Sequence, residues 1–197
     1  MLKWLVGSGR AIMQAWFMLI NFCIFKLYRV QYLQFPDISG VIVCRGKGKL
    51  VFGAKVKVNS SIRSNPVGLT HRTYFYVSPS GIIAIGNNVG ISNSLLFSIN
   101  SITICDYVII GGGCQIFDND FHSIQYEYRI LHEDSNIRSA PIVIKTGAFI
   151  GASSIILKGV TIGERSVIAA GSVVTKSVPS DQIWGGNPAK FLKNLNE

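Results

Sequence analysis

Acidic residues are scarce in the first half of this 197-residue chain. Residues 1–105 contain eleven lysines and arginines and a single acid, Asp37, for a net charge of +10, whereas residues 106–197 contain eight basic and nine acidic residues. Such a surplus predicts either a solvated basic surface or an anionic partner, which means lipid head groups or nucleic acid. The sequence has no recognisable nucleic-acid-binding module and no basic stretch interleaved with stacking aromatics, which argues against nucleic acid.

Histidine and cysteine are few, and neither is spaced as in a metal site. The four cysteines include no C-x-x-C pair, and the three histidines are His71, His122 and His132. A zinc site needs three or four converging ligands, so we expect no metal. The cysteines are predicted to be small buried side chains in a reducing compartment. An A-x-A-like cleavage site is missing after the apolar start, so no signal peptide is expected.

A long apolar run that could span a bilayer is also missing. Residues 11–25 are uncharged, but a span needs about 20 apolar residues, and Gln14 and Asn21 interrupt this stretch. Basic residues flank it on both sides. The pattern predicts an apolar, basic N-terminal helical segment, residues 1–36, that either lies in the interface of an anionic membrane or packs against protein.

Five basic residues alternate with other residue types beyond this segment. They are Arg45, Lys47, Lys49, Lys55 and Lys57. Because alternate residues of a strand share a face, we expect these side chains to line one exposed surface.

A six-residue period dominates the second half of the chain. Every sixth residue from 144 to 174 is isoleucine or valine, a period that fits neither a helix nor a simple strand. It predicts a chain that makes a short strand and turns every six residues, with the repeated side chain pointing into one stacked core. The period also runs through Ile85, Ile91 and Phe97, slips by one residue, and resumes through Ile104, Ile110 and Ile116; Phe52 and Val58 fit it too. Residues 64–81 break it and are predicted to form an excursion loop or a hairpin.

The I-G-x-x-x-V units resemble those of the hexapeptide-repeat acyltransferases. This resemblance implies an all-β fold, a left-handed parallel β-helix over residues 37–197, with the apolar N-terminal helical segment, an excursion loop and a short C-terminal helix. The γ-class carbonic anhydrases share the repeat. Residues 167–193, "VIAAGSVVTKSVPSDQIWGGNPAKFLK", are similar to the end of the maltose, galactoside and polysaccharide O-acetyltransferases. The family also implies a homotrimer with active sites between subunits.

The stretch "FDNDFHSI", residues 117–124, contains the candidate catalytic group. His122 sits where the repeat gives way to a loop, as the catalytic histidine of these acetyltransferases does, and the resemblance implies a general base. Asp118 or Asp120 either orients the imidazole or caps the loop through backbone bonds. Ser123 replaces the commoner proline, which favours the polysaccharide-modifying branch.

The same resemblance assigns residues to the two substrates. The acetyl-CoA-binding candidates are Phe149, Ala152, Ala170, Thr175, Lys176, Lys190 and Lys193. The acceptor-binding candidates are Ser92 and Asn93. A lysine suits a phosphate as a compact point charge, and small residues let the pantetheine arm lie along the backbone.

We therefore expect an acetyl-CoA-dependent O-acetyltransferase that modifies a sugar hydroxyl in the biosynthesis of surface polysaccharide or a lipid-linked saccharide. Its expected place is the cytoplasm, with peripheral contact at the inner face of the cell membrane. Two alternatives remain open at this point. One is an N-acetyltransferase for a nucleotide amino-sugar or a small amine, and the other is a non-catalytic β-helix scaffold.

Overall fold

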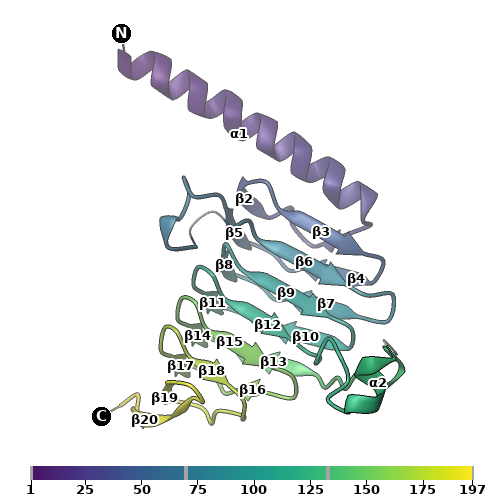
Figure 1. Cartoon of the computed structure of the whole chain (residues 1–197). Helices are drawn as coiled ribbons and strands as arrows, with labels where there is room; N and C mark the ends of the chain where they lie inside the picture. Colours follow the sequence, from purple (N-terminus) through teal and green to yellow (C-terminus); the bar gives the residue numbers. More distant parts are fainter. Residues whose placement is uncertain (1, 69–70, 132–133, 197) are drawn as a thin grey trace.

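The computed structural model describes residues 2–68, 71–131 and 134–196, with the side chains of 2–11 and 134 left out; His132 lies outside the described residues. Short strands stack into three sheets that form the walls of a left-handed β-helix (Figure 1). Sheet A consists of β1 (Gln31–Tyr32), β4 (Lys49–Phe52), β7 (Ile82–Ile85), β10 (Ser101–Ile104), β13 (Ile142–Ile144) and β16 (Thr161–Ile162). Sheet B consists of β2 (Asp37–Gly40), β5 (Lys57–Ser60), β8 (Gly90–Ser92), β11 (Ile109–Ile110), β14 (Phe149–Ile150), β17 (Val167–Ile168), β19 (Gln182–Gly185) and β20 (Lys190–Asn194). Sheet C consists of β3 (Val43–Gly46), β6 (Tyr74–Val77), β9 (Leu95–Ser98), β12 (Gln115–Phe117), β15 (Ile155–Leu157) and β18 (Val173–Val174).

The predicted column of inward side chains is confirmed for the C-terminal coils. Ile144, Ile150, Ile156, Ile162, Ile168 and Val174 all have no exposed surface. The prediction is wrong at one upstream position: Leu96, and not Phe97, points into the core, and Phe97 lies on the outer face of sheet C. The step from Ile91 to Leu96 is five residues and the step from Leu96 to Ile104 is eight, so the six-residue period is broken on both sides of β9.

The bounds of the excursion and the structure of the C-terminus also differ from the prediction. Residues 74–77, placed in the excursion by the sequence, form β6, because Phe75 and Val77 alternate into the core. The excursion is therefore residues 61–73, with a short 3₁₀ turn at Pro66–Gly68. The expected C-terminal helix is absent from the described residues, and the chain instead reverses so that β20 pairs antiparallel with β19. This pairing supplies hydrogen-bond partners to the last edge of sheet B.

The N-terminal helix α1 (Leu2–Leu27) lies across the first coil and extends past it (Figure 1). Phe25 is 2% exposed and contacts Phe52 at a ring-centroid distance of 5.4 Å, so this end of the helix covers the open end of the core. Asn21 is fully buried: its amide donates to the Gly40 carbonyl at 2.9 Å, and its Oδ1 accepts from the Ile42 N–H at 3.1 Å. No helix in the described part of the chain has the length and hydropathy needed to cross a bilayer.

The basic residues of the first coils do not share one surface, as the alternation had suggested. Arg45 lies on sheet C, Lys49 on sheet A and Lys57 on sheet B, while Lys47 and Lys55 occupy the corners between sheets. All five are exposed. Each strand here has only four residues, so the chain turns into the next wall before the alternation can continue. The five basic residues therefore lie around the prism below α1, and we call them the basic belt.

Replacing Asn21 by alanine should lower the free energy of unfolding by about 2–4 kcal/mol, because two buried backbone groups lose their hydrogen-bond partner. Denaturant titration measures the loss, and the matched control is Cys23→Ala, an exposed position on the same helix. An equal effect of the two substitutions would show that the Asn21 bonds do not hold α1 in place.

Candidate active site

The second loop leaves the prism at the edge between sheets C and A. It runs from β12 to β13 and includes α2 (Tyr126–Ile130) and a 3₁₀ turn (Asp134–Asn136). His122 lies near its start and is exposed to solvent. Among the described residues, the imidazole has no hydrogen-bond partner.

Asp118 fixes the first residue of this loop to the preceding coil. Its carboxylate is fully buried and accepts hydrogen bonds from the Ser98 hydroxyl at 2.7 Å and from the backbone N–H groups of Ile99 and Asn100, both at 2.9 Å. The Asn119 side-chain amide adds a bond at 3.2 Å. These bonds correspond to the loop-capping role that the sequence left open, and none of them reaches His122.

Asp120 holds the next part of the loop from the other side. Its carboxylate forms an ion pair with Lys158, which follows β15, and its backbone carbonyl accepts the His122 N–H at 2.6 Å. Its own N–H donates to the Arg138 carbonyl at 3.1 Å. Asp120 therefore positions the backbone of His122 rather than its ring.

An aromatic ladder, which the sequence analysis did not identify, holds the same segment against sheet C. Phe121 adopts a φ of +60° and packs on Phe97 and Phe117, with ring centroids 4.7 and 5.0 Å away. Phe97 in turn stacks on Tyr76 at 4.1 Å with an interplanar angle of 8°. The signal was present in the sequence, since Tyr76, Phe97 and Phe117 are spaced by about one full coil.

The proposed donor residues occupy two different edges of the prism. Ala152 and Ala170 lie one coil apart at the edge between sheets B and C, where the Ala152 carbonyl accepts the Gly171 N–H at 2.8 Å. Thr175 and Lys176 follow β18 at the edge between sheets C and A, the same edge as the His122 loop. The remaining candidates lie on sheet B and are exposed: Phe149 on β14, and Lys190 and Lys193 on β20. One chain alone does not bring these side chains together.

The acceptor candidates lie at the end of β8. The Ser92 hydroxyl accepts from the Asn59 side-chain amide at 3.0 Å. Asn93 is 1% exposed and donates to the His71 carbonyl at 2.7 Å, whereas its buried Oδ1 has no partner among the described residues. Beside it, a hollow of about 820 Å³ between the excursion and sheet C is lined by His71, Arg72 and Phe97 among others.

The described residues contain no group of three histidine, cysteine or acidic side chains close enough to hold a metal. Two of the four thiols, those of Cys44 and Cys114, are buried as expected, while Cys23 is exposed. Burial raises the pKa of Cys44 to about 12 and also raises the pKa of Cys114. Both therefore remain protonated, and neither is suited to act as a nucleophile.

Comparison with known proteins identifies the family. The family model described as the hexapeptide repeat of succinyl-transferase matches residues 141–176. The galactoside O-acetyltransferase of Escherichia coli (strain K12) is 31% identical over 128 residues, which are 62% of this chain and 62% of that protein. A hexapeptide-repeat-containing acetyltransferase from Vibrio cholerae O1 biovar eltor, crystallised with acetyl coenzyme A, is 36% identical over 64% of this chain and 70% of its own, with a TM-score of 0.54. The chain belongs to the hexapeptide-repeat acetyltransferases.

The fold of this family extends over most of the chain. An N-acyltransferase from Bacillus cereus, only 20% identical, aligns with 86% of this chain and 87% of its own at a TM-score of 0.65. The chain spans 62% of the length of the galactoside enzyme.

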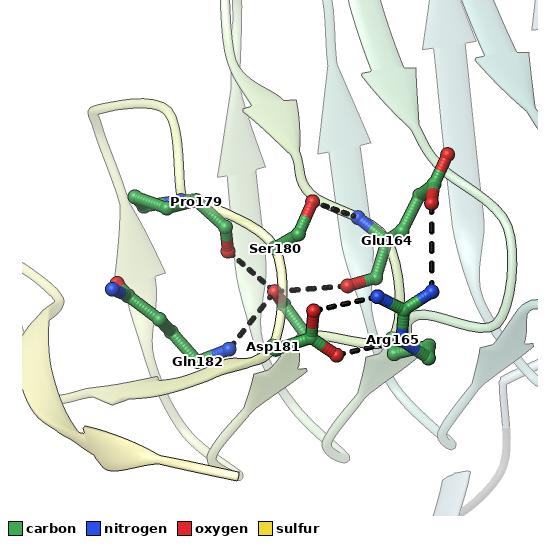
Figure 2. Close-up of polar contacts among 7 residues, drawn as sticks. Glu164, Arg165, Pro179, Ser180, Asp181 and Gln182 are labelled. Carbon is green, nitrogen blue, oxygen red and sulfur yellow. Dashed lines mark hydrogen bonds and ion pairs between the residues drawn. The ribbon is translucent and has the colours of Figure 1, made fainter.

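A bidentate ion pair between Arg165 and Asp181 fixes the last coil, next to β19 and β20. Figure 2 shows the Arg165 guanidinium facing Asp181, with both nitrogen–oxygen distances at 2.6 Å. Ser180 adds a bond by accepting the Glu164 N–H at 3.1 Å. The Asp181 carbonyl accepts the Leu195 N–H at 2.8 Å. The hydrogen bond from Arg165 lowers the pKa of Asp181.

The Arg165→Gln variant should be less stable than the wild type at neutral pH, and this difference should disappear in acid. Because the folded-state pKa of Asp181 is lowered, the pair stabilises the fold above the unfolded-state pKa of about 3.9, and this stabilisation is lost as the pH falls through the lower folded-state value. Thermal unfolding measured between neutral pH and about pH 2 tests this dependence. Arg129→Gln is the control, since Arg129 donates to the carbonyls of Ser123 and Ile124; a constant difference for Arg165→Gln across the pH range would contradict the assignment.

Proposed function

We propose that this protein is an acetyl-CoA-dependent O-acetyltransferase that modifies a sugar hydroxyl during the assembly of a surface polysaccharide or a lipid-linked saccharide. The observation that carries the proposal is the solvent-exposed His122 at the start of a loop. Asp118, Asp120 and Phe121 each bind this segment to the β-helix. The Vibrio cholerae relative bound to acetyl coenzyme A supports the donor, and the Escherichia coli galactoside enzyme supports a sugar acceptor.

His122 acts as the general base. Its imidazole takes the proton of the acceptor hydroxyl while the oxygen attacks the thioester carbonyl of acetyl-CoA. The carbon–sulfur bond then breaks, the acetyl group stays on the sugar oxygen, and the proton passes from the imidazole to the departing CoA sulfur. A backbone N–H of the β-helix wall stabilises the oxyanion between the two steps. Asp118 and Asp120 serve the reaction by fixing the loop on which the imidazole is carried.

Two copies of the chain form each site in this proposal, within a homotrimer. The argument is geometric, because Ala152 and Ala170 lie at one edge of the prism, whereas His122 lies at another. Packing the first edge of one copy against the second edge of its neighbour brings the two halves together. The pantetheine arm then runs along Phe149, Ala152 and Ala170. Thr175 and the C-terminal lysines, Lys176, Lys190 and Lys193, meet the nucleotide phosphates.

The acceptor enters from the side of Ser92 and Asn93 in this proposal. The unpartnered Oδ1 of Asn93 is a hydrogen-bond acceptor that a sugar hydroxyl could satisfy after a small movement of the excursion. The hollow beside it has the size of an ordinary small-molecule site, which is about 300–1,000 Å³.

Helix α1 brings the enzyme to an anionic membrane surface at the inner face of the cell membrane. Its outer face is apolar and uncovered, with Ile12 71%, Trp16 60% and Leu19 54% exposed. The basic belt lies just below, where lipid phosphates would meet it. Phe25 and Asn21 are buried against the first coil, whereas Ile12, Trp16 and Leu19 are exposed and remain available for this contact.

The substitution His122→Ala should lower kcat by about 10²–10⁴-fold and leave acetyl-CoA affinity unchanged, because the imidazole meets the hydroxyl and not the nucleotide. His122→Asn, which keeps a hydrogen-bonding group without the basicity, should be nearly as inactive. Release of the CoA thiol with a panel of sugars, nucleotide sugars and amines measures the rate. Ile124→Ala, at an exposed position of the same loop, is the control, and a folded His122→Ala protein with wild-type turnover would refute the proposed role.

The double variant Trp16→Gln, Leu19→Gln should bind vesicles that contain phosphatidylglycerol at least about tenfold more weakly, because each buried side chain of this size contributes about 1.5–3 kcal/mol. Vesicle sedimentation measures the binding, which should also weaken at high salt. Ile62→Gln, an exposed apolar residue of the excursion, is the control. Unchanged vesicle binding, or a change of oligomer size by light scattering in its place, would mean that α1 covers protein rather than lipid.

A further inference from the structure

A groove of about 910 Å³ separates α1 from the outer face of sheet B. Ala15 and Met18 of α1 form one wall, and Phe35 and Ile109 lie on the opposite side. Met18 is also 62% exposed, so the groove continues into the uncovered apolar face of the helix. None of the candidate acetyl-CoA or acceptor residues lines it, and the site described above does not account for it.

Gly90 lies in the lining of the groove and leaves open space above sheet B. In the register of sheet B, Gly90 lies between Lys57 of β5 and Ile109 of β11, where its neighbours point outward. A Cβ atom built on Gly90 meets no atom within 4 Å. The missing side chain therefore leaves open space, and a larger residue at this position would fill the groove without disturbing the sheet.

The charge of the groove is concentrated at one place. Lys55 and Lys57 line it, and neither belongs to an ion pair of the described residues. Asp37, directly opposite Lys57 in the register of β2 and β5, is the only acid of the lining. Apolar walls with a net positive charge at one point suit an amphipathic anion.

We propose that this groove binds an apolar chain that ends in a phosphate, with the chain between α1 and sheet B and the phosphate at Lys55 and Lys57. A second copy of the protein is a poorer occupant. Its own residues 1–105 carry eleven basic residues and only one acid, Asp37, so they would repel Lys55 and Lys57 rather than pair with them. The proposal depends on the proposed function only in that α1 brings the groove to a bilayer. The occupant we propose is an isoprenoid phosphate of the bilayer, because its single apolar chain and terminal phosphate match one apolar groove with lysines at one place. A bilayer phospholipid is an alternative outcome of the test.

Isothermal titration of the full-length protein, without acetyl-CoA, tests the groove with four probes. Farnesyl phosphate should bind once per chain, farnesol about five- to tenfold more weakly, and inorganic phosphate not detectably at the same concentration. Dihexanoylphosphatidylglycerol tests the alternative occupant, and tighter binding of this lipid than of farnesyl phosphate would overturn the assignment to an isoprenoid phosphate. Failure of farnesyl phosphate to bind also overturns the proposal.

Variants place the binding in the groove. Gly90→Phe should abolish farnesyl phosphate binding, whereas Gly90→Ala, which leaves most of the space, should retain it. Replacing Lys55 and Lys57 by glutamine should weaken farnesyl phosphate binding about fivefold or more and leave farnesol unaffected, while Lys49→Gln, in the same coil on sheet A, should change neither.

Wild-type affinity in both Gly90→Phe and the double lysine variant overturns the assignment, as does a Gly90→Phe protein that changes oligomer size and keeps its lipid affinity. His122→Ala should bind farnesyl phosphate as the wild type does. A failure of lipid binding with acetyl transfer intact therefore refutes the groove alone, and the reverse result refutes only the proposed reaction.

Discussion

The burial of the apolar side chains that each wall sends inward in each coil is the constraint on which the rest of this molecule depends. Most strands have only two to four residues, too few to be stable alone, and each is held by parallel neighbours in the coils before and after it. Ile144, Ile150 and Ile156 have no exposed surface because every wall sends its residue to the same axis. A rigid column results, and it leaves the edges between walls as the places where the chain can depart without loss of core.

Both departures occur at such edges, and both are tied back to the column by polar bonds rather than by apolar packing alone. The excursion is held by Asn93 of the following coil, whose side-chain amide donates to the His71 carbonyl. The second loop is tied by Asp118, whose carboxylate accepts two N–H groups of the corner one coil earlier. The coils of the β-helix thus supply hydrogen-bonding groups at fixed positions, and each loop is bound to such groups. These bonds fix the start of the loop that carries His122.

The periodic part of the fold could be predicted from the sequence because a six-residue repeat is a local property, visible without knowledge of the partners. Phe97 was misplaced because the length of one corner decides which residue points inward. The C-terminal hairpin was missed because β20 forms only where the free edge of β19 is available. His122 was singled out by its place at a break in the repeat and by the family resemblance, and its catalytic role stays a prediction. The partner of Asp120, in contrast, is Lys158, 38 residues away, and no spacing rule connects them.

The uneven distribution of charge along the sequence becomes a charge difference between the two ends of the folded molecule. A β-helix keeps sequence order along its axis, so residues 1–105, with a net charge of +10, occupy the α1 end, and residues 106–197, with a net charge of −1, occupy the other (Figure 1). The protein is therefore an electric dipole aligned with its long axis. In the field of an anionic surface such a dipole experiences a torque before any contact is made, over distances of about a Debye length. The α1 end would turn toward such a surface first, and this would shorten the rotational search before contact.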